Sequence, residues 1–245
     1  MSESSEIVVA ATSDIHGFLD GLEEEVLSIN PHILVIAGDI HPCYIHIDAD
    51  RWFRDEFFPF VRELAKKSIY VVAIPGNHDF WLTDYLAWKI DCELPPNFHL
   101  LLDQEEIFYG LHFYGTPWVP WINGNWCFEA SNKTLEYAFA GIPESRIDVL
   151  IAHSPPLIDH QQIDISTQKD RSCWRHFGSR ELLKEIKLKS PRYLFCGHIH
   201  SGDHGVHNIE CESGRICSAY NVSRVNERYE VSYPLTVVRI PVEGV

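Results

Sequence analysis

Five short apolar runs, rich in β-branched residues, place the strongest constraint on how this chain folds. They span residues 7–11, 33–37, 70–74, 148–152 and 193–196. Runs that are apolar throughout are typical of strands buried on both faces, as in sheets that are covered by helices. The sequence therefore predicts an α/β fold in which these runs are strands.

A polar cluster follows each run at its carboxyl-terminal end. The clusters are Asp14-Ile15-His16, Gly38-Asp39, Gly76-Asn77-His78-Asp79, His153 and Gly197-His198-Ile199-His200. Aspartate oxygen, histidine nitrogen and asparagine oxygen are ligands that divalent first-row metals accept. Ligand sites of α/β sheets form at the carboxyl ends of strands, and a glycine beside a ligand lets the backbone come close to the site. The clusters therefore predict one metal site built from several strand ends.

Taken together and in this order, the clusters resemble the pattern D-x-H, G-D, G-N-H-[DE], H, G-H-x-H of the calcineurin-like metallophosphoesterase superfamily. The match spans residues 14–200, and the joint pattern is specific although D-x-H alone would carry little information. Segments 115–121 and 153–156 and the Gly-His-Ile-His form are similar to the metallophosphoesterase-domain-containing group related to class III cyclic-nucleotide phosphodiesterases. The resemblance implies a four-layered αββα sandwich, with two mixed β-sheets flanked by helices.

The resemblance also implies a binuclear centre of divalent metal ions, and manganese, iron, zinc, nickel and cobalt all fit mixed nitrogen and oxygen ligands. One metal would be held by Asp14, His16, Asp39 and His200, and the second by Asp39, Asn77, His153 and His198. Asp39 would bridge the two ions, and a hydroxide shared between them would attack phosphorus. His78 would protonate the leaving oxygen or stabilise its charge, with Asp79 orienting the imidazole through a hydrogen bond.

The charge balance agrees with a phosphoester substrate. Two divalent ions carry four positive charges, whereas only Asp14 and Asp39 add carboxylates, so positive charge remains even with a bridging hydroxide. The chain has a formal net charge of −15 and no basic patch, which disfavours nonspecific binding to long nucleic acid. The sequence thus predicts a metal-dependent phosphodiesterase acting on small phosphodiesters, with a cyclic nucleotide as a reasonable substrate.

Two features keep other functions open. Pro42 stands where many family members carry Asp or Asn, and aromatic residues are concentrated in the segment 108–126, at Phe108, Tyr109, Phe113, Tyr114, Trp118, Trp121 and Trp126. Aromatic faces could stack a nucleobase, but the segment could instead pack into the core or cap the sheet. A phosphomonoesterase, a nuclease and a nucleotide-binding scaffold with little turnover are therefore alternatives. The sequence does not specify the natural substrate, the native metals or the oligomeric state.

Length and composition predict a single domain over residues 1–245. The sequence also predicts a cytoplasmic protein. No run approaches the ~18 apolar residues of a membrane span, residues 2–6 form a polar tail without signal-sequence character, and the seven cysteines are scattered, as reduced thiols are. Helices are expected at about 18–29, 50–67, 79–91, 126–140 and 179–189, with Asp50 and Ser179 as N-caps. Runs at 205–209, 215–222 and 235–242 predict a second sheet after the last metal cluster.

Overall fold

The first large sheet is built around the three amino-terminal apolar runs. In this computed structural model, which describes residues 5–42, 48–87, 89–158, 163–170 and 173–242, the strand order is β15-β1-β2-β3-β4. The bounds are β1 Ser5–Thr12, β2 Ile33–Ala37, β3 Tyr70–Ile74, β4 Phe98–Leu100 and β15 Thr236–Val242. The strands from β1 to β4 run parallel, and β15 pairs antiparallel with β1. The run at 235–242, expected in a second sheet, instead completes the first, because its pairing covers the free edge of β1.

The second large sheet has the order β13-β14-β12-β9-β6-β5. Its bounds are β5 Gln104–Phe108, β6 Leu111–Thr116, β9 Val149–Ala152, β12 Tyr193–Cys196, β13 Val206–Glu210 and β14 Ile216–Asn221. The four inner strands are parallel and the two edge strands antiparallel. Two short pairs lie outside it, β7 Val119–Pro120 with β8 Glu129–Ala130, and β10 Thr167–Asp170 with β11 Cys173–His176. Both large sheets are thus mixed, as predicted.

The helices mostly follow the predicted segments but are shorter. Their bounds are α1 Leu22–Ile29, α2 Ala49–Trp52, the π-helical η1 Phe53–Phe57, α3 Phe58–Ala65, α4 Phe80–Leu86, α5 Asn132–Ala140 and α6 Arg180–Lys189. The π turn precedes Pro59, whose missing N–H interrupts the regular α-helical pattern. Ser179 caps α6 as predicted, with its side chain accepting from Leu182 N.

Two predictions about helix starts were wrong. The N-cap of α2 is Asp48 and not Asp50, because the Asp50 carboxylate instead accepts from Arg54 Nε at 2.8 Å and Trp81 Nε1 at 3.1 Å. The helix expected from residue 126 begins only after Ser131, since Phe128 has a left-handed backbone with φ 56° and residues 129–130 form β8.

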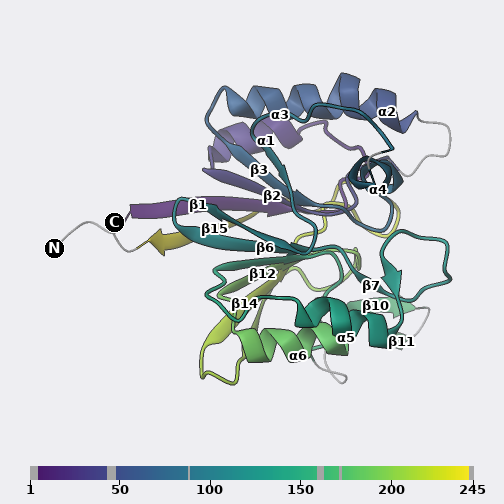
Figure 1. The fold of residues 1–245 in the computed structure, drawn as a ribbon, viewed down its shortest axis with the longest axis vertical. Coiled ribbons are helices and arrows are strands. Elements are labelled where there is room, and N and C mark those ends of the chain that lie inside the picture. Colours follow the sequence, from purple (N-terminus) through teal and green to yellow (C-terminus); the bar gives the residue numbers. More distant parts are fainter. Residues whose placement is uncertain (1–4, 43–47, 88, 159–162, 171–172, 243–245) are drawn as a thin grey trace.

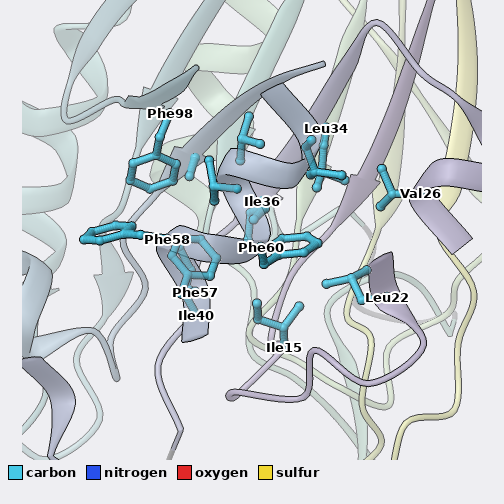
Figure 2. Packing of buried hydrophobic residues seen from close by; sticks show 14 of the residues in the cluster. Ile15, Leu22, Val26, Leu34, Ile36, Ile40, Phe57, Phe58, Phe60 and Phe98 are labelled. Carbon is cyan, nitrogen blue, oxygen red and sulfur yellow. The ribbon is translucent and has the colours of Figure 1, made fainter. Parts of the chain in front are cut away.

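The layers follow from alternation of side chains along the strands. Helices α1 and α3 cover the outer face of the first sheet, and α5 and α6 cover the outer face of the second (Figure 1). On β2, Leu34 and Ile36 belong to the buried cluster under the helices, together with Phe58 (Figure 2). Val35, between them, belongs to the cluster between the two sheets. Residues of the second sheet, such as Phe195, belong to the same buried cluster as Val35. The observed order is the predicted αββα sandwich.

This arrangement sets the carboxyl ends of β1, β2 and β3 in one sheet beside those of β9 and β12 in the other. Backbone hydrogen bonds tie the loops that follow, since Asp14 N donates to Gly38 O at 2.9 Å and Gly197 N donates to His153 O at 3.0 Å. Within the described residues, no helix is long and apolar enough to cross a membrane.

Candidate metal centre

Five strand ends deliver all the predicted ligands to one edge of the sandwich. Asp14 and His16 follow β1, Asp39 follows β2, Asn77 to Asp79 follow β3, His153 follows β9, and His198 and His200 follow β12. Within this set, two groups bring metal-ligating atoms within 4.8 Å of one another: Asp14 with His16 and His200, and Asp14 with Asp39 and His153. The sheet topology therefore produces two adjacent candidate cation positions.

The first group has three potential metal-ligating atoms that face one another. The Nε2 atoms of His16 and His200 lie 3.3 Å apart, and His200 Nε2 lies 3.3 Å from Asp14 Oδ1. His200 Nδ1 donates to Asn226 O at 3.2 Å, because a carbonyl can only accept. The hydrogen on Nδ1 thus points away from the site, and Nε2 faces the carboxylate and His16, as it does in a metal ligand.

The second group repeats this arrangement. His153 Nδ1 donates to Ala37 O at 2.8 Å, and its Nε2 faces Asn77 Oδ1, 3.0 Å away, and Asp39 Oδ2, 3.4 Å away. Asp39 Oδ2 also lies 3.8 Å from His16 Nε2 of the first group. Asp39 thus lies near both groups, and its role as a bridging ligand stays a prediction.

Electron-rich atoms that face one another in a buried site need a cation between them. Burial lowers the pKa of His153, but the nearby Asp39 carboxylate outweighs it and raises that pKa to about 9; Asp14 likewise raises the pKa of His200 to about 9 against burial. Burial instead lowers the pKa of His16 to about 4 and that of His198 to about 3. The donor set therefore fits divalent metal ions, which would take the places that protons occupy on His153 and His200.

Asn77 and His198 complete the predicted second ligand set. Asn77 Oδ1 faces His153 as described, and the His198 ring lies 5.1 Å from the His153 ring between centroids. The His198 backbone N donates to Asp14 Oδ2 at 3.0 Å. Both residues lie at the site, and their coordination of metal stays a prediction.

Strained backbone is concentrated at the ligands. Asp14, His16, Asp39 and His198 have φ values of 49°, 41°, 53° and 67°, in the left-handed region. Such conformations cost about 1–2 kcal/mol per non-glycine residue and persist where surrounding contacts enforce them. The four ligands are therefore held in position by the loops rather than by their own backbone preference.

Crowding around the site explains the glycine at position 38, which has φ 95°. A Cβ there would lie 2.5 Å from His153 Nδ1 and 2.9 Å from Gly76 Cα. The expected close approach of backbone at a glycine is confirmed, because His153 can reach Ala37 O only without a side chain at residue 38.

His78 and Asp79 occupy different environments. The His78 ring lies at the mouth of the centre, with its side chain 18% exposed and Nε2 3.9 Å from Asp39 Oδ2. Buried Asp79 accepts from the amides of Gly76 at 2.7 Å and His41 at 2.8 Å, and burial raises its pKa to about 7. Asp79 thus fastens the loop after β3 to the loop after β2, and its expected orientation of the His78 imidazole stays a prediction.

The sequence did not indicate the serines that hold Asp14. Ser223 Oγ donates to Asp14 Oδ2 at 2.7 Å, and Ser13 Oγ donates to the same oxygen. Ser13 adjoins its partner in the chain, so adjacency could have suggested it. Ser223 lies 209 positions from Asp14 and is placed by the end of β14, which gives no local signal.

Two aromatic rings lie beside histidines of the centre. The Trp126 ring lies 4.3 Å from the His78 ring between centroids. Tyr229 lies 4.9 Å from the His16 ring and 5.4 Å from the His200 ring. Of the two, only Trp126 belongs to the aromatic segment that the sequence singled out.

Most of that segment packs away from the centre. Phe108, Phe113 and Tyr114 are buried core residues, which agrees with the core alternative. Trp118 Nε1 donates to Asp103 Oδ2 at 2.7 Å, whereas Trp121 is 63% exposed. The nucleobase-stacking hypothesis therefore concerns Trp126 alone.

Pro42, the departure from the family pattern, has a packing role. A Cβ on Gly17, whose φ is 82°, would meet the Pro42 Cβ at 2.9 Å, so the proline ring lies directly on the glycine that follows His16. Gly17 N also donates to Ile40 O at 2.9 Å. Pro42 thus packs the loop after β2 against the loop after β1.

Comparison with known proteins identifies the class of this fold and site. The family model for calcineurin-like phosphoesterases matches residues 7–202. The chain therefore belongs to the calcineurin-like phosphoesterase family. The donor set gives this member of the family a candidate dimetal site.

Relatives with known sequences occur in Caenorhabditis elegans. The chain is 26% identical to UPF0046 protein T07D4.2 over 256 residues, covering 92% of this chain and 59% of that protein. It is 33% identical to UPF0046 protein C25E10.12 over 210 residues, covering 79% and 68%. The chain thus spans about three-fifths of the length of the first of these relatives.

Solved structures share the fold at low identity. TT1561 of Thermus thermophilus superposes with a TM-score of 0.58 at 14% identity, covering 96% of this chain and 99% of that one. Phosphopantetheinyl hydrolase (PptH) of Mycobacterium tuberculosis superposes with a TM-score of 0.54 at 14% identity, covering 96% of both chains. These likenesses support the sandwich architecture.

Proposed function

We propose that the chain hydrolyses small phosphodiesters, with cyclic nucleotides as the preferred class. The observation that carries this proposal is the position of His78, whose ring stands at the mouth of the centre between the Asp39 carboxylate and the Trp126 ring. Two bound divalent ions would supply Lewis-acid polarisation of the phosphoryl group and a nucleophile at neutral pH.

Residues of the chain would protonate the leaving group and position the metal ligands. His78 donates a proton to the leaving oxygen, because its partly exposed imidazole can reach both solvent and substrate. Asp39 Oδ1 accepts from the His78 backbone N at 2.9 Å, which fixes the distance between the acid and the ligand. Ser13 and Ser223 orient the Asp14 carboxylate through their hydroxyl groups.

The two aromatic residues favour a diester over a monoester. Trp126 lies against the proton donor His78, and Tyr229 lies against His16 of the first group, so the two organic substituents of a diester can each meet an aromatic face. A monoester has one such substituent and would use one face. A nucleoside could stack on Trp126, since base stacking on aromatic side chains contributes about 1–3 kcal/mol.

The test is a substrate panel with metal-loaded protein. Protein refilled with manganese, iron, zinc or cobalt is assayed on bis(4-nitrophenyl) phosphate, 4-nitrophenyl phosphate and 2′,3′- and 3′,5′-cyclic AMP. We expect diester turnover to exceed monoester turnover, and His78→Ala to lower kcat by about 100-fold or more. His207→Ala is the matched control, because His207 pairs with Asp203 at 2.7 Å outside the centre.

Three outcomes would overturn this proposal. Monoester turnover above diester turnover would favour a phosphomonoesterase, and nucleotide binding without turnover under every metal would favour a scaffold. Unchanged kcat in His78→Ala would remove the assigned proton donor.

A substitution pair tests the aromatic contribution. Trp126→Ala is expected to raise KM for cyclic AMP at least about fivefold, as lost stacking predicts, whereas Trp121→Ala should leave it within about twofold, because the Trp121 ring is 63% exposed. Equal KM values in the two variants would show that Trp126 does not contact the substrate.

A further inference from the structure

A cavity lies at the edge of the sandwich opposite the metal centre. Its volume is about 620 Å³, and its lining comes from residues just before β9, β12 and β14, with Pro241 near the end of β15. The four residues each of β9 and β12 separate this edge from His153 and His198, a distance of about 13 Å at ~3.3 Å per residue. The cavity is therefore distinct from the candidate metal centre.

Arginines dominate the polar part of this lining. Arg146, Arg192 and Arg215 all face the cavity, and none of the residues described in its lining is acidic. The whole chain has 35 Asp and Glu against 20 Lys and Arg, so this concentration runs against the composition. The parallel pairing of neighbouring strands brings the three together, since Ser218 N donates to Arg192 O at 3.0 Å and Arg192 N donates to Ile147 O at 3.3 Å.

A buried carboxylate behind the wall fixes two of the arginines. Asp148 Oδ1 accepts from Arg146 Nη2 and from Arg192 Nη1, both at 3.0 Å, and its carboxylate is fully buried. The Arg192 guanidinium also lies over the Tyr193 ring, 5.7 Å from the centroid. These contacts hold both guanidinium groups in place before any ligand arrives, which reduces the entropy cost of binding.

The third arginine, Arg215, has a guanidinium that is available for a ligand. Arg215 is exposed, and no ion pair or hydrogen bond of its guanidinium occurs within the described part of the chain. Three guanidinium groups and one carboxylate, Asp148, leave two positive charges at the cavity. A compact dianion such as a phosphate monoester matches this charge, and the planar donors of arginine match its oxygen atoms.

The rest of the lining is apolar. Pro191, Ile216 and Pro241 face the same space, and Ile216 is 49% exposed although it begins a strand. Volumes of about 300–1,000 Å³ are typical of sites for small organic ligands. We propose that this cavity binds an organic phosphate, with the phosphate group on Arg146, Arg192 and Arg215 and the apolar body against Ile216 and the two prolines.

The test titrates phenylphosphonate, a phosphate mimic with a ring and an unreactive C–P bond, into the metal-loaded protein by calorimetry. We expect two classes of site in the wild type, one at each end of the sandwich. Arg215→Gln should weaken one class by about tenfold or more, the loss expected for a charge-assisted hydrogen bond. Asp39→Asn should remove the other class. Arg62→Gln, an equal charge change on exposed residue 62 of α3, is the matched control and should bind as the wild type does.

Two further probes separate the parts of the proposal. Inorganic phosphate lacks the ring and benzoate lacks the phosphate group, so both should bind the Arg215-dependent class about tenfold more weakly than phenylphosphonate. Binding of phenylphosphonate that is unchanged in Arg215→Gln, or abolished entirely by Asp39→Asn, would overturn the site. Equal affinity for benzoate would overturn the choice of phosphate, and equal affinity for inorganic phosphate would overturn the apolar contact.

Discussion

Substituting Gly38 by alanine should damage the metal centre through crowding rather than through loss of any ligand. The new Cβ would lie 2.5 Å from His153 Nδ1 and 2.9 Å from Gly76 Cα, about 1 Å inside ordinary van der Waals contact. Metal-ligand distances tolerate only about 0.2 Å of displacement. The His153 imidazole must therefore leave both Ala37 O and its position in the second ligand group.

The magnitude has two parts. The left-handed φ of 95° at Gly38 costs an alanine about 1–2 kcal/mol, and overpacking costs about 1–3 kcal/mol. The expected loss in the free energy of unfolding is thus about 2–5 kcal/mol. Gly110→Ala is a matched control, because Gly110 also has a left-handed φ, 77°, but a Cβ there meets nothing within 4 Å. It should lose only the backbone part, about 1–2 kcal/mol.

The assay combines urea unfolding with measurement of bound metal by mass spectrometry. Gly38→Ala should unfold at lower urea than Gly110→Ala and should retain less metal than the wild type, whereas Gly110→Ala should retain all of it. Equal unfolding free energies for the two variants, or full metal content in Gly38→Ala, would refute the crowding explanation.

Two further predictions concern groups that hold charged side chains. Ser223→Ala removes one donor from Asp14 and should lower metal affinity about 10–100-fold; a metal titration checks this, with Ser213→Ala as the control because its hydroxyl donates to Ser190 instead. Burial raises the pKa of Asp148, but hydrogen bonds from His112 N, Arg146 and Arg192 outweigh it and hold that pKa below its ordinary value. Its stabilisation is therefore complete above about pH 4 and is lost as the pH falls through the lowered pKa. Asp148→Asn should cost about 1.5–3 kcal/mol at neutral pH, and urea unfolding should show the difference from the wild type narrowing below pH 4; a difference that persists unchanged there would contradict the assignment.

The strands and the positions of the candidate ligands at their ends could be predicted because both signals are local. The run at 33–37 is a strand buried on both faces of its sheet, and Asp39 follows it closely, so position in the chain fixes position at the sheet edge. Ser223 could not be predicted in this way. Its contact with Asp14 depends on β14 lying beside β12, a pairing between segments that the local sequence does not specify.

Tertiary contacts also explain the wrong helix start at residue 126. Helical periodicity would favour continuation, but Cys127 N donates to Asn77 O at 3.1 Å, and Val119 N donates to Phe128 O at 3.0 Å. These bonds hold the segment in a bend and turn near the metal centre and place Trp126 beside His78. The local propensity is overridden at the position where the chain borders the site.

An acidic chain that binds anions must do so through local positive charge. The source of that positive charge differs between the two ends of this sandwich. The formal charge of −15 opposes any phosphoester nearby, although salt screens it beyond ~8 Å at physiological ionic strength. At the metal centre the chain contributes the buried carboxylates of Asp14 and Asp39, so attraction for phosphate there depends on divalent ions. At the opposite edge the guanidinium groups belong to the chain itself. Chelation should therefore abolish phenylphosphonate binding at the metal centre and leave the Arg215-dependent class unchanged; loss of both classes on chelation would show that the second depends on the first.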